Sequence, residues 1–474
     1  MERKVHIMFL PFLGQGHLIP MGEMAKAFSR RGVRATIATT PLNVGSIRRS
    51  IGESESESES EIKIESMEFP GVEAGLPEGC ENVESVPSQE LLMPFFKATA
   101  MLQPQLEGLI RRHRPHCLIS GSFFPWAADS AAKFNIPRLV FHGTSVFAQC
   151  ASECLRLYQP HKSASSDSEP FLIPHLPGEV HMTRMMLPHY AMTDEQNDFT
   201  RAFQAVRESE MRSHGVIVNS FYELEEVYAD YYNQVVGRRA WYIGPLSLCN
   251  RDLKVKRGKQ ASVDEGEILK WLDSKKPNSV VYVCFGSIAN FGESQLREIA
   301  KGLEDSGQEF IWVVRRSDKE WLPEGFERRT EGRGMIIWGW APQVLILEHQ
   351  GVGAFVTHCG WNSTLEAVSA GVPMVTWPVA AEQFYNEKFV TQILQIGISV
   401  GVQKMVRIVG DSISSKALEK ALNRIMLGDE AEAIRNRANT LAQMARAAVQ
   451  PNGSSYAQFT HLIQHITSIA CPQN

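Results

Sequence analysis

The first residues whose types and spacing suggest chemistry are Gly14-Gln15-Gly16-His17, which follow an apolar run near the start of the chain. The two glycines allow a tight turn, and His17 then falls at the beginning of a helical stretch. A histidine titrates near neutral pH, which suits a residue that takes up and releases a proton. The position also fits a histidine that begins a helix and has no chemical role. Ile19 stands where GxGxxG would have its third glycine, which argues against a nicotinamide dehydrogenase.

A second group of polar residues lies in the C-terminal half, where a turn joins a strand to a helix. The apolar run Ala354–Thr357 predicts the strand, and the helix is expected from Asn362 onward. The free N–H groups and partial positive charge of a helix N-terminus favour phosphate. The candidates to hold a diphosphate are therefore His358, the backbone near Gly360, Asn362 and Ser363.

Other polar and aromatic residues on both sides of this turn extend the candidate site. Trp340 offers a flat face to a base, Glu366 can accept hydrogen bonds from ribose hydroxyls, and Glu382 and Gln383 can accept from sugar hydroxyls. Structural roles fit some of them equally well. Ser363-x-x-Glu366 has the spacing of a helix capping box, and a lone tryptophan most often packs in a core or on the surface.

Strand-like apolar runs alternate with helical stretches along the whole chain, and the pattern restarts after the middle. Such runs, covered by amphipathic helices, predict parallel sheets with helices on both faces. Two series predict an α/β chain of two doubly wound domains, with a ligand in the cleft beyond the carboxyl ends of the strands. The expected strands are Val5–Leu10, Val33–Thr39, Glu61–Glu68, Cys117–Gly121, Arg138–Gly143, Val216–Asn219, Val280–Phe285, Phe310–Val314, Met335–Trp338, Ala354–Thr357 and Met374–Trp377.

Changes in composition suggest the domain boundaries. Residues 246–266 are polar and basic without periodicity, so we expect a linker between a first domain, 1–245, and a second domain, 267–453. A helical stretch in 454–474 is expected to pack back toward the first domain. Residues 53–61 alternate Glu and Ser and are expected to form a solvated loop.

The overall composition limits the class of protein. The chain has 474 residues, 43% hydrophobic and 21% charged, with a net charge of −5, so nucleic acid is not an expected partner. No apolar run approaches the roughly 20 residues of a membrane span. The eight cysteines show no CxxC pair or zinc spacing, which favours reduced thiols in the cytoplasm. We also expect a monomer.

The segment from Trp340 to Gln383, with its order W-APQ, HCGWNS, E and EQ, resembles the signature of plant secondary-product UDP-glycosyltransferases. The resemblance extends from PFLGQGHLIPM through FFPWAADSAAKFNIPRLVFHG to the C-terminal helix, and its details look most like the branch acting on flavonoids and triterpenoids. It implies the GT-B architecture, in which two Rossmann-like domains face each other across a cleft. The first domain would bind the acceptor and the second the UDP-sugar.

The resemblance also implies roles for the residues of the donor half. Trp340 would stack on uracil, Gln343 would lie by the nucleoside and Glu366 would bind the ribose. A terminal Gln is usually associated with glucose, so UDP-glucose is the expected co-substrate. No acidic pair is present for a metal, and no metal or other cofactor is expected. The implied donor-binding set is Ser287, Trp340, Ala341, Gln343, His358, Trp361, Asn362, Ser363, Glu366, Glu382 and Gln383.

In the acceptor half, the resemblance implies that His17 is the general base of a direct, inverting displacement that turns UDP-α-glucose into a β-glucoside. The chain departs from the family at Gly121, where an Asp usually orients this histidine. A Ser hydroxyl could orient His17 instead, or the acceptor could be acidic enough to need no help. Alternatively, the protein is a C-glycosyltransferase of an electron-rich phenol, or a UDP-sugar-binding protein with impaired catalysis.

Aromatic and methionine side chains of the first domain predict a lining for a small, flat, hydrophobic acceptor. Most of them could equally belong to the core. The acceptor is expected to be a phenolic, flavonoid-type compound or a triterpenoid. The candidates are Met93, Phe95, Phe96, Phe123, Phe124, Phe147, Met185, Met186 and His189.

Overall fold

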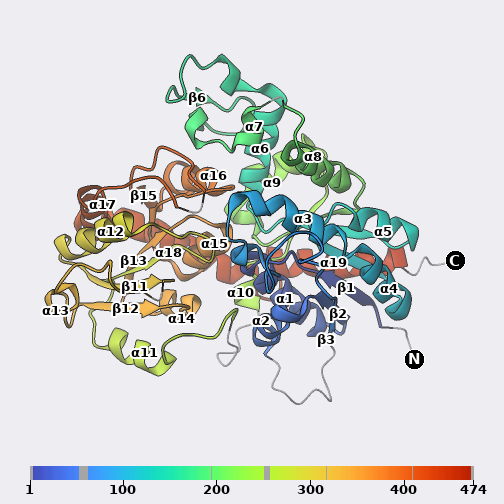
Figure 1. Cartoon of the computed structure of the whole chain (residues 1–474), viewed down its shortest axis with the longest axis horizontal. Coiled ribbons are helices and arrows are strands. Elements are labelled where there is room, and N and C mark those ends of the chain that lie inside the picture. Colours follow the sequence, from blue (N-terminus) through green and yellow to red (C-terminus); the bar gives the residue numbers. More distant parts are fainter. Residues whose placement is uncertain are drawn as a thin grey trace.

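The computed structural model describes residues 4–52, 62–193, 195–249, 257–316, 318–407 and 409–470. Two α/β halves lie side by side, the first mostly blue to green and the second yellow to red (Figure 1). The expected solvated loop at 53–61 and part of the expected linker, residues 250–256, lie outside the described residues.

The first half is built on a parallel sheet of seven strands in the order β3-β2-β1-β4-β5-β8-β9. Every residue of β1 and β4 is buried, as expected for apolar strands covered by helices on both faces. The strands are β1 (His6–Leu10), β2 (Arg34–Thr39), β3 (Ile62–Ser66), β4 (Cys117–Gly121), β5 (Arg138–Phe141), β8 (Gly215–Val218) and β9 (Ala240–Tyr242).

The second half repeats this plan with six parallel strands in the order β12-β11-β10-β13-β14-β15. A short antiparallel pair, β6 (Phe171–Leu172) with β7 (His181–Met182), stands apart from both sheets. The strands of the second sheet are β10 (Val280–Cys284), β11 (Glu309–Val314), β12 (Gly334–Trp338), β13 (Val352–Thr357), β14 (Met374–Thr376) and β15 (Gly397–Ser399).

Helices cover both sheets. In the first half they are α1 (Gln15–Ser29), α2 (Pro41–Ile51), α3 (Leu92–Ala100), α4 (Gln103–His113), α5 (Ala127–Lys133), α6 (Val146–Tyr158), α7 (His189–Met192), α8 (Asp198–Met211), α9 (Tyr222–Gln234) and α10 (Leu246–Cys249). In the second half they are α11 (Glu265–Asp273), α12 (Glu293–Asp305), α13 (Phe326–Arg329), α14 (Gln343–Leu347), α15 (Trp361–Ala370), α16 (Gln383–Lys388), α17 (Ser415–Leu427) and α18 (Ala431–Ala448). The last helix is α19 (Ser454–Ala470). Among the described helices, none is both long and apolar enough to cross a membrane.

The observed strands of the two sheets coincide with the expected ones to within a few residues, but β9 and β15, like the short β6 and β7, were not expected. β9 and β15 have only three residues each and lie at the ends of their sheets. Runs this short are hard to recognise as strands from the sequence, although all three residues of β9 are apolar and buried. The start of the expected linker is also not irregular. Residues Leu246–Cys249 form α10, whose Leu246 and Leu248 are buried.

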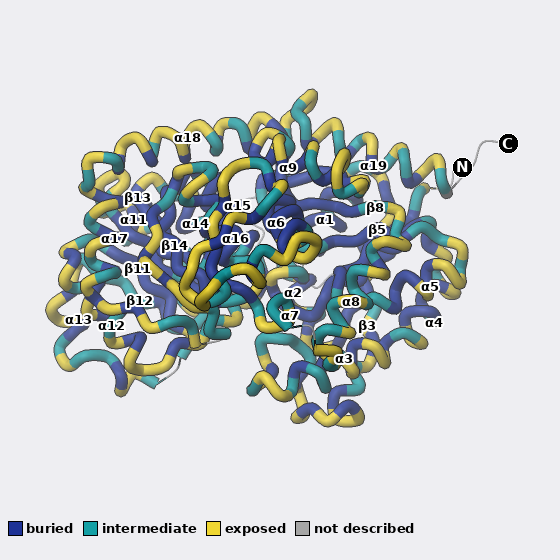
Figure 2. Tube along the Cα trace, turned by 90° about the horizontal axis from the view of Figure 1, so that it is seen from above, coloured by how far each residue is buried: buried dark blue, intermediate teal, exposed yellow. Residues whose placement is uncertain are grey.

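The C-terminal helix α19 follows the second half but packs on the first. Phe459 makes an edge-to-face contact with Phe28 of α1, with ring centroids 4.6 Å apart, and the Arg31 guanidinium lies 4.2 Å from the Phe459 centroid. Phe459, Leu462 and Ile466 belong to the same buried cluster as strands β1 and β2. Viewed from above, α18 and α19 run along one edge of the molecule and span both halves (Figure 2).

Candidate active site

A cavity of about 1850 Å³ lies where the carboxyl ends of the two sheets face each other. Both halves contribute to its wall, His17 and Phe123 from the first and Trp340, His358 and Gln383 from the second. All members of the expected donor-binding set line this cavity. Their roles toward a ligand stay predictions.

The expected phosphate end is formed where buried β13 turns into α15. Gly360 precedes the helix without a side-chain cap. The Trp361 N–H donates to Glu382, so the next N–H groups of α15, those of Asn362 and Ser363, remain available to an anion. His358 is half-buried beside this helix, and burial lowers its pKa to about 4. It is therefore a neutral hydrogen-bonding group at pH 7. Gly286 leaves room for it, because a Cβ there would lie 2.5 Å from His358 Cε1.

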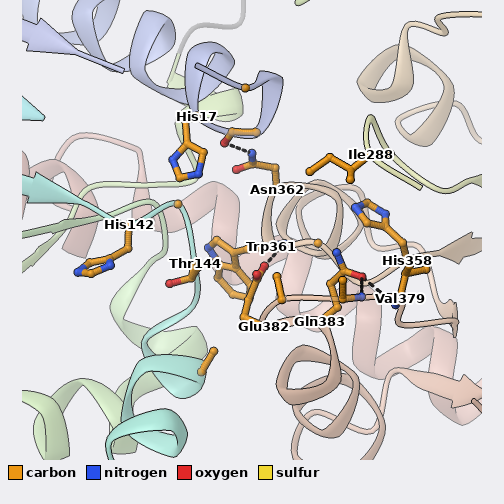
Figure 3. A pocket seen from close by; sticks show the side chains of 18 of the residues that line it. His17, His142, Thr144, Ile288, His358, Trp361, Asn362, Val379, Glu382 and Gln383 are labelled. Carbon is orange, nitrogen blue, oxygen red and sulfur yellow. Dashed lines mark hydrogen bonds between the residues drawn. The ribbon is translucent and has the colours of Figure 1, made fainter. Parts of the chain in front are cut away.

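Asn362, the second residue of α15, reaches across the cleft. Its Nδ2 donates a hydrogen bond to the backbone carbonyl of Gly16, 2.7 Å away (Figure 3). Its Oδ1 is buried and has no partner among the described residues. Asn362 therefore joins the expected phosphate site directly to the turn that precedes His17.

The capping-box interpretation of Ser363 and Glu366 is wrong. Helix α15 begins at Trp361, so Ser363 lies inside the first turn and does not cap the helix. Gln343 Nε2 instead donates to both Ser363 Oγ (3.0 Å) and Glu366 Oε2 (2.7 Å). Arg257, which sequence reasoning missed, donates from Nη1 to Glu366 Oε1 at 2.9 Å. These residues form one polar network beside the expected nucleoside position.

The expected sugar end is held by α16 and the residues before it. Gln383 Oε1 accepts hydrogen bonds from the backbone N–H groups of Val379 (2.8 Å) and Ala380 (2.9 Å), which fixes the side-chain amide (Figure 3). Burial raises the pKa of Glu382, whose Oε1 accepts from the Trp361 backbone N–H at 3.4 Å. Trp361 is only 2% exposed, so it supports the wall from behind more than it offers a face to a sugar.

His17 is the third residue of α1 and is half-buried at the cavity wall. Burial, and to a lesser degree the charge of nearby His142, lower its pKa to about 4. Its Nδ1 is buried and has no hydrogen-bond partner among the described residues. The rings of Phe12 and Phe123 contact it edge-on, with centroids at 5.4 Å and 6.1 Å.

The residues at and near Gly121 supply no group that orients the His17 ring. Gly121 ends β4, and a Cβ there would lie 3.1 Å from both Cβ and the backbone nitrogen of Phe12. The neighbouring Ser120 Oγ accepts a hydrogen bond from Arg138 Nε at 2.8 Å. Asp129 pairs with Arg212 instead. No Ser hydroxyl or carboxylate in the described part of the chain orients His17, so orientation by a serine is not realised.

A second histidine of the cavity has the carboxylate that His17 lacks. His142 follows β5 immediately, and its Nε2 lies 2.8 Å from Glu210 Oε2 on α8. Burial would raise the pKa of Glu210, but His142 and Arg238 lower it to about 2. His142 could have been noticed because it stands at the carboxyl end of a strand, whereas nothing in the sequence points to Glu210.

The expected acceptor lining is correct in part. Phe96, Phe123, Met185 and His189 line the cavity. Phe95 and Phe124 are fully buried in a core cluster, Phe147 stacks on Phe389 at 5.0 Å, and Met186 is buried as well. Met93 is half-buried but does not reach the cavity wall. Residues that sequence reasoning missed are Tyr190, whose ring stacks on Phe203 at 4.0 Å, and Phe199.

Comparison with known proteins identifies the family. The family model described as UDP-glucoronosyl and UDP-glucosyl transferase matches residues 249–438, and the glycosyltransferase N-terminal domain model matches residues 3–248. The scopoletin glucosyltransferase of Nicotiana tabacum is 55% identical over 469 residues, covering 98% of both chains. This chain belongs to the plant family-1 UDP-glycosyltransferases. Another relative of this family, the UDP-glucose flavonoid 3-O-glucosyltransferase 7 of Fragaria ananassa, is 52% identical and covers 99% of this chain and 97% of its own.

Solved structures of plant UDP-glycosyltransferases confirm the GT-B architecture. UGT73P12 of Glycyrrhiza uralensis, complexed with glycyrrhetinic acid 3-O-monoglucuronide, superposes with a TM-score of 0.91 at 41% identity and covers 98% of this chain and 96% of its own. UGT71G1 of Medicago truncatula, complexed with UDP-glucose, gives a TM-score of 0.81 at 29% identity and covers 98% of both chains. The expected fold and enzyme class, a UDP-glycosyltransferase, are therefore correct.

Proposed function

We propose that this UDP-glycosyltransferase transfers glucose from UDP-glucose, with inversion, to a phenolic hydroxyl of a small hydrophobic plant metabolite. The observation that carries the proposal is that His17 and the whole donor-binding set line one cavity. The names of the scopoletin and flavonoid glucosyltransferases, 55% and 52% identical to this chain, support glucose and a phenolic acceptor.

The donor is assigned to the second half of the cleft. Trp340 stacks on uracil, Gln343 and Glu366 bind the nucleoside, and the N-terminus of α15 with His358 and Ser287 holds the diphosphate. Gln383, whose amide is fixed by two backbone N–H groups, faces the glucose. In this assignment the helix terminus and neutral His358 stabilise the charge on departing UDP, so no divalent cation is required. Among the described residues, no group of three or more His, Cys, Asp or Glu side chains is arranged to hold a metal ion.

His17 is assigned as the general base. The acceptor O–H proton passes to His17 Nε2 while the oxygen attacks the anomeric carbon, and the bond from that carbon to the diphosphate oxygen breaks to release UDP. For Nε2 to accept the proton, neutral His17 must carry its own proton on Nδ1. That buried N–H has no acceptor among the described residues, which costs about 1–3 kcal/mol.

The low basicity of His17, whose Nδ1 has no partner among the described residues, favours acidic hydroxyl acceptors such as phenols over aliphatic alcohols. A base with a pKa lowered to about 4 takes a proton poorly, so the substrate must release it easily. A phenol, with a pKa of about 10, does so far more readily than an aliphatic alcohol, which resembles water at about 15.7. We therefore expect phenols to be better acceptors than the aliphatic hydroxyls of triterpenoids.

An acceptor panel with UDP-glucose tests this function. Coumarins, flavonoids and triterpenoid alcohols are compared by acceptor-dependent UDP release, and products are analysed by mass spectrometry and NMR. We expect acid-labile β-O-glucosides with phenols as the best acceptors. Acid-stable C-glucosides would assign the enzyme to carbon attack, and UDP binding without release for any acceptor would identify a binding protein.

A further inference from the structure

Arg257 lies in the basic segment between the two halves, yet its side chain is only 23% exposed. It donates from Nε and Nη2 to the two carboxylate oxygens of Glu23, at 2.5 Å and 3.1 Å. From Nη1 it donates to Glu366 Oε1 at 2.9 Å. One guanidinium therefore binds a carboxylate from each half of the molecule.

The two carboxylates belong to the two functional halves of the cleft. Glu23, 3% exposed, lies on α1, the helix that carries His17 near its start. Glu366 lies on α15, whose N-terminus is the expected phosphate site, and its other oxygen accepts from Gln343. A planar guanidinium holds both partners in a fixed geometry, which a lysine ammonium cannot do.

The residues that follow Arg257 also contact both halves, through hydrogen bonds and close packing. The Gly258 carbonyl accepts from Arg49 Nε on α2 at 2.7 Å. Gly258 has φ +68°, and a Cβ there would lie 2.7 Å from Trp340 Cζ2 and 2.8 Å from Ile19 Cδ1. Trp340 also exchanges two hydrogen bonds with Ser262, at 2.8 Å and 2.9 Å. Residues 257–262 are therefore held in place by contacts with both halves, along the expected nucleoside end of the cavity.

We propose that Arg257 is a positioning residue of the donor site: it fixes the Glu366 carboxylate for the ribose hydroxyls and links it, through Glu23, to the helix that bears the base. A carboxylate has about four lone-pair sites, so Glu366 Oε1 can accept from Arg257 and from a ribose hydroxyl together. The inference rests on the proposed function, in which Glu366 binds the ribose.

Binding of UDP and of 2′-deoxy-UDP, measured by calorimetry, separates positioning from a general structural role. The ratio of the Kd for 2′-deoxy-UDP to the Kd for UDP reports the contact between the 2′-hydroxyl and Glu366, and it exceeds one where that contact is made. Arg257→Met should weaken UDP binding about tenfold to a hundredfold, as expected for the loss of a charge-assisted hydrogen bond. It should also bring the ratio close to one. Arg257→Lys should recover only part of both losses.

Two further variants make the outcome decisive. Arg329→Met removes a guanidinium that pairs with Glu304 elsewhere in the second half, and it should change neither Kd. Glu23→Gln keeps the contact between Arg257 and Glu366 but weakens the ion pair between Arg257 and residue 23. It should therefore lower the ratio as well, by a smaller amount. Glu23→Gln provides the test if Arg257→Met does not fold.

The comparison with Glu366→Gln distinguishes failure of the inference from failure of the proposed function. If Glu366→Gln lowers the ratio while Arg257→Met and Glu23→Gln leave it unchanged, the positioning role is refuted and the ribose assignment stands. If Glu366→Gln itself leaves the ratio unchanged, the ribose assignment fails and the inference fails with it.

Discussion

Asn362 Nδ2 donates a hydrogen bond of 2.7 Å to the carbonyl of Gly16, so the N-terminus of α15 is joined to the turn that begins α1. The two residues lie 346 positions apart in the chain. Through this bond, and through Arg257, the half that is assigned to UDP-glucose is held in register with the half that carries His17.

Loss of this cross-cleft bond should reduce turnover more than it reduces the stability of the fold. Asn362→Ala leaves the Gly16 carbonyl at a hydrated cleft, where the net loss in folding free energy is about 1 kcal/mol. Turnover should fall by about tenfold or more, because misplaced reacting groups lose much of their proximity advantage. Steady-state kinetics and thermal melting of the variant provide the two readouts. A normal kcat would show that the bond has no part in alignment.

Trp340 and Gln383 should affect different parts of the donor. Trp340→Ala should weaken binding of UDP and UDP-glucose alike, since base stacking contributes about 1–3 kcal/mol. Gln383→Ala should reduce use of UDP-glucose and spare UDP, because its amide is assigned to the sugar. Calorimetry with both ligands compares the variants. Equal losses of UDP affinity in the two would contradict the assignment.

Gly121→Asp should help aliphatic acceptors more than phenols. A carboxylate near Nδ1 would accept a hydrogen bond from the Nδ1–H group and stabilise the imidazolium, which is worth about tenfold or more in rate. The Cβ contact with Phe12 at 3.1 Å should cost about 1–3 kcal/mol of folding free energy. The test compares wild type and variant with one phenol and one alcohol of similar size. If the alcohol gains nothing relative to the phenol, the link between Gly121 and acceptor acidity is wrong.

The pH profile should reflect the lowered pKa of His17. The neutral imidazole is the active form, so kcat/KM falls as the pH drops through the pKa of His17. Because burial and His142 lower this pKa from 6.5 to about 4, activity should persist below pH 6. His142→Gln should move the acid limb to slightly higher pH, since it removes the smaller of the two causes. An acid limb near 6.5 in the wild type would show that His17 is not buried as described.

Divalent metal should be dispensable for transfer. The diphosphate is assigned to the α15 N-terminus, His358 and Ser287, which supply hydrogen bonds without a cation. EDTA should therefore leave the initial rate almost unchanged. Loss of most activity in EDTA, followed by recovery with Mg²⁺, would overturn this assignment.

The sequence could predict that the candidate donor-site residues lie together, because most of them are close together in the chain. His358, Asn362 and Glu366 follow one strand and occupy one helix, so local structure alone brings them to the cleft. Arg257 could not be found in this way. It lies in a basic, aperiodic segment, and its contact with Glu23 spans 234 positions.

The lining of the cavity in the first half could be predicted only in part, because residue type does not separate a core aromatic from one that lines a cavity. Phe123 and Phe124 are adjacent after β4, yet Phe123 faces the cavity and Phe124 is fully buried. The orientation of His17 was also beyond prediction. The substitution at Gly121 is visible in the sequence, but the unpartnered Nδ1 is visible only in the structure.

The rate of His17→Ala with UDP-glucose and a phenolic coumarin tests the central claim most directly. If His17 is the base, kcat should fall about 10²–10⁴-fold, the usual contribution of general base catalysis, while the Kd for UDP stays within about twofold of wild type. The matched variant Arg329→Met should keep both values. A His17→Ala enzyme with wild-type kcat would contradict the proposed mechanism.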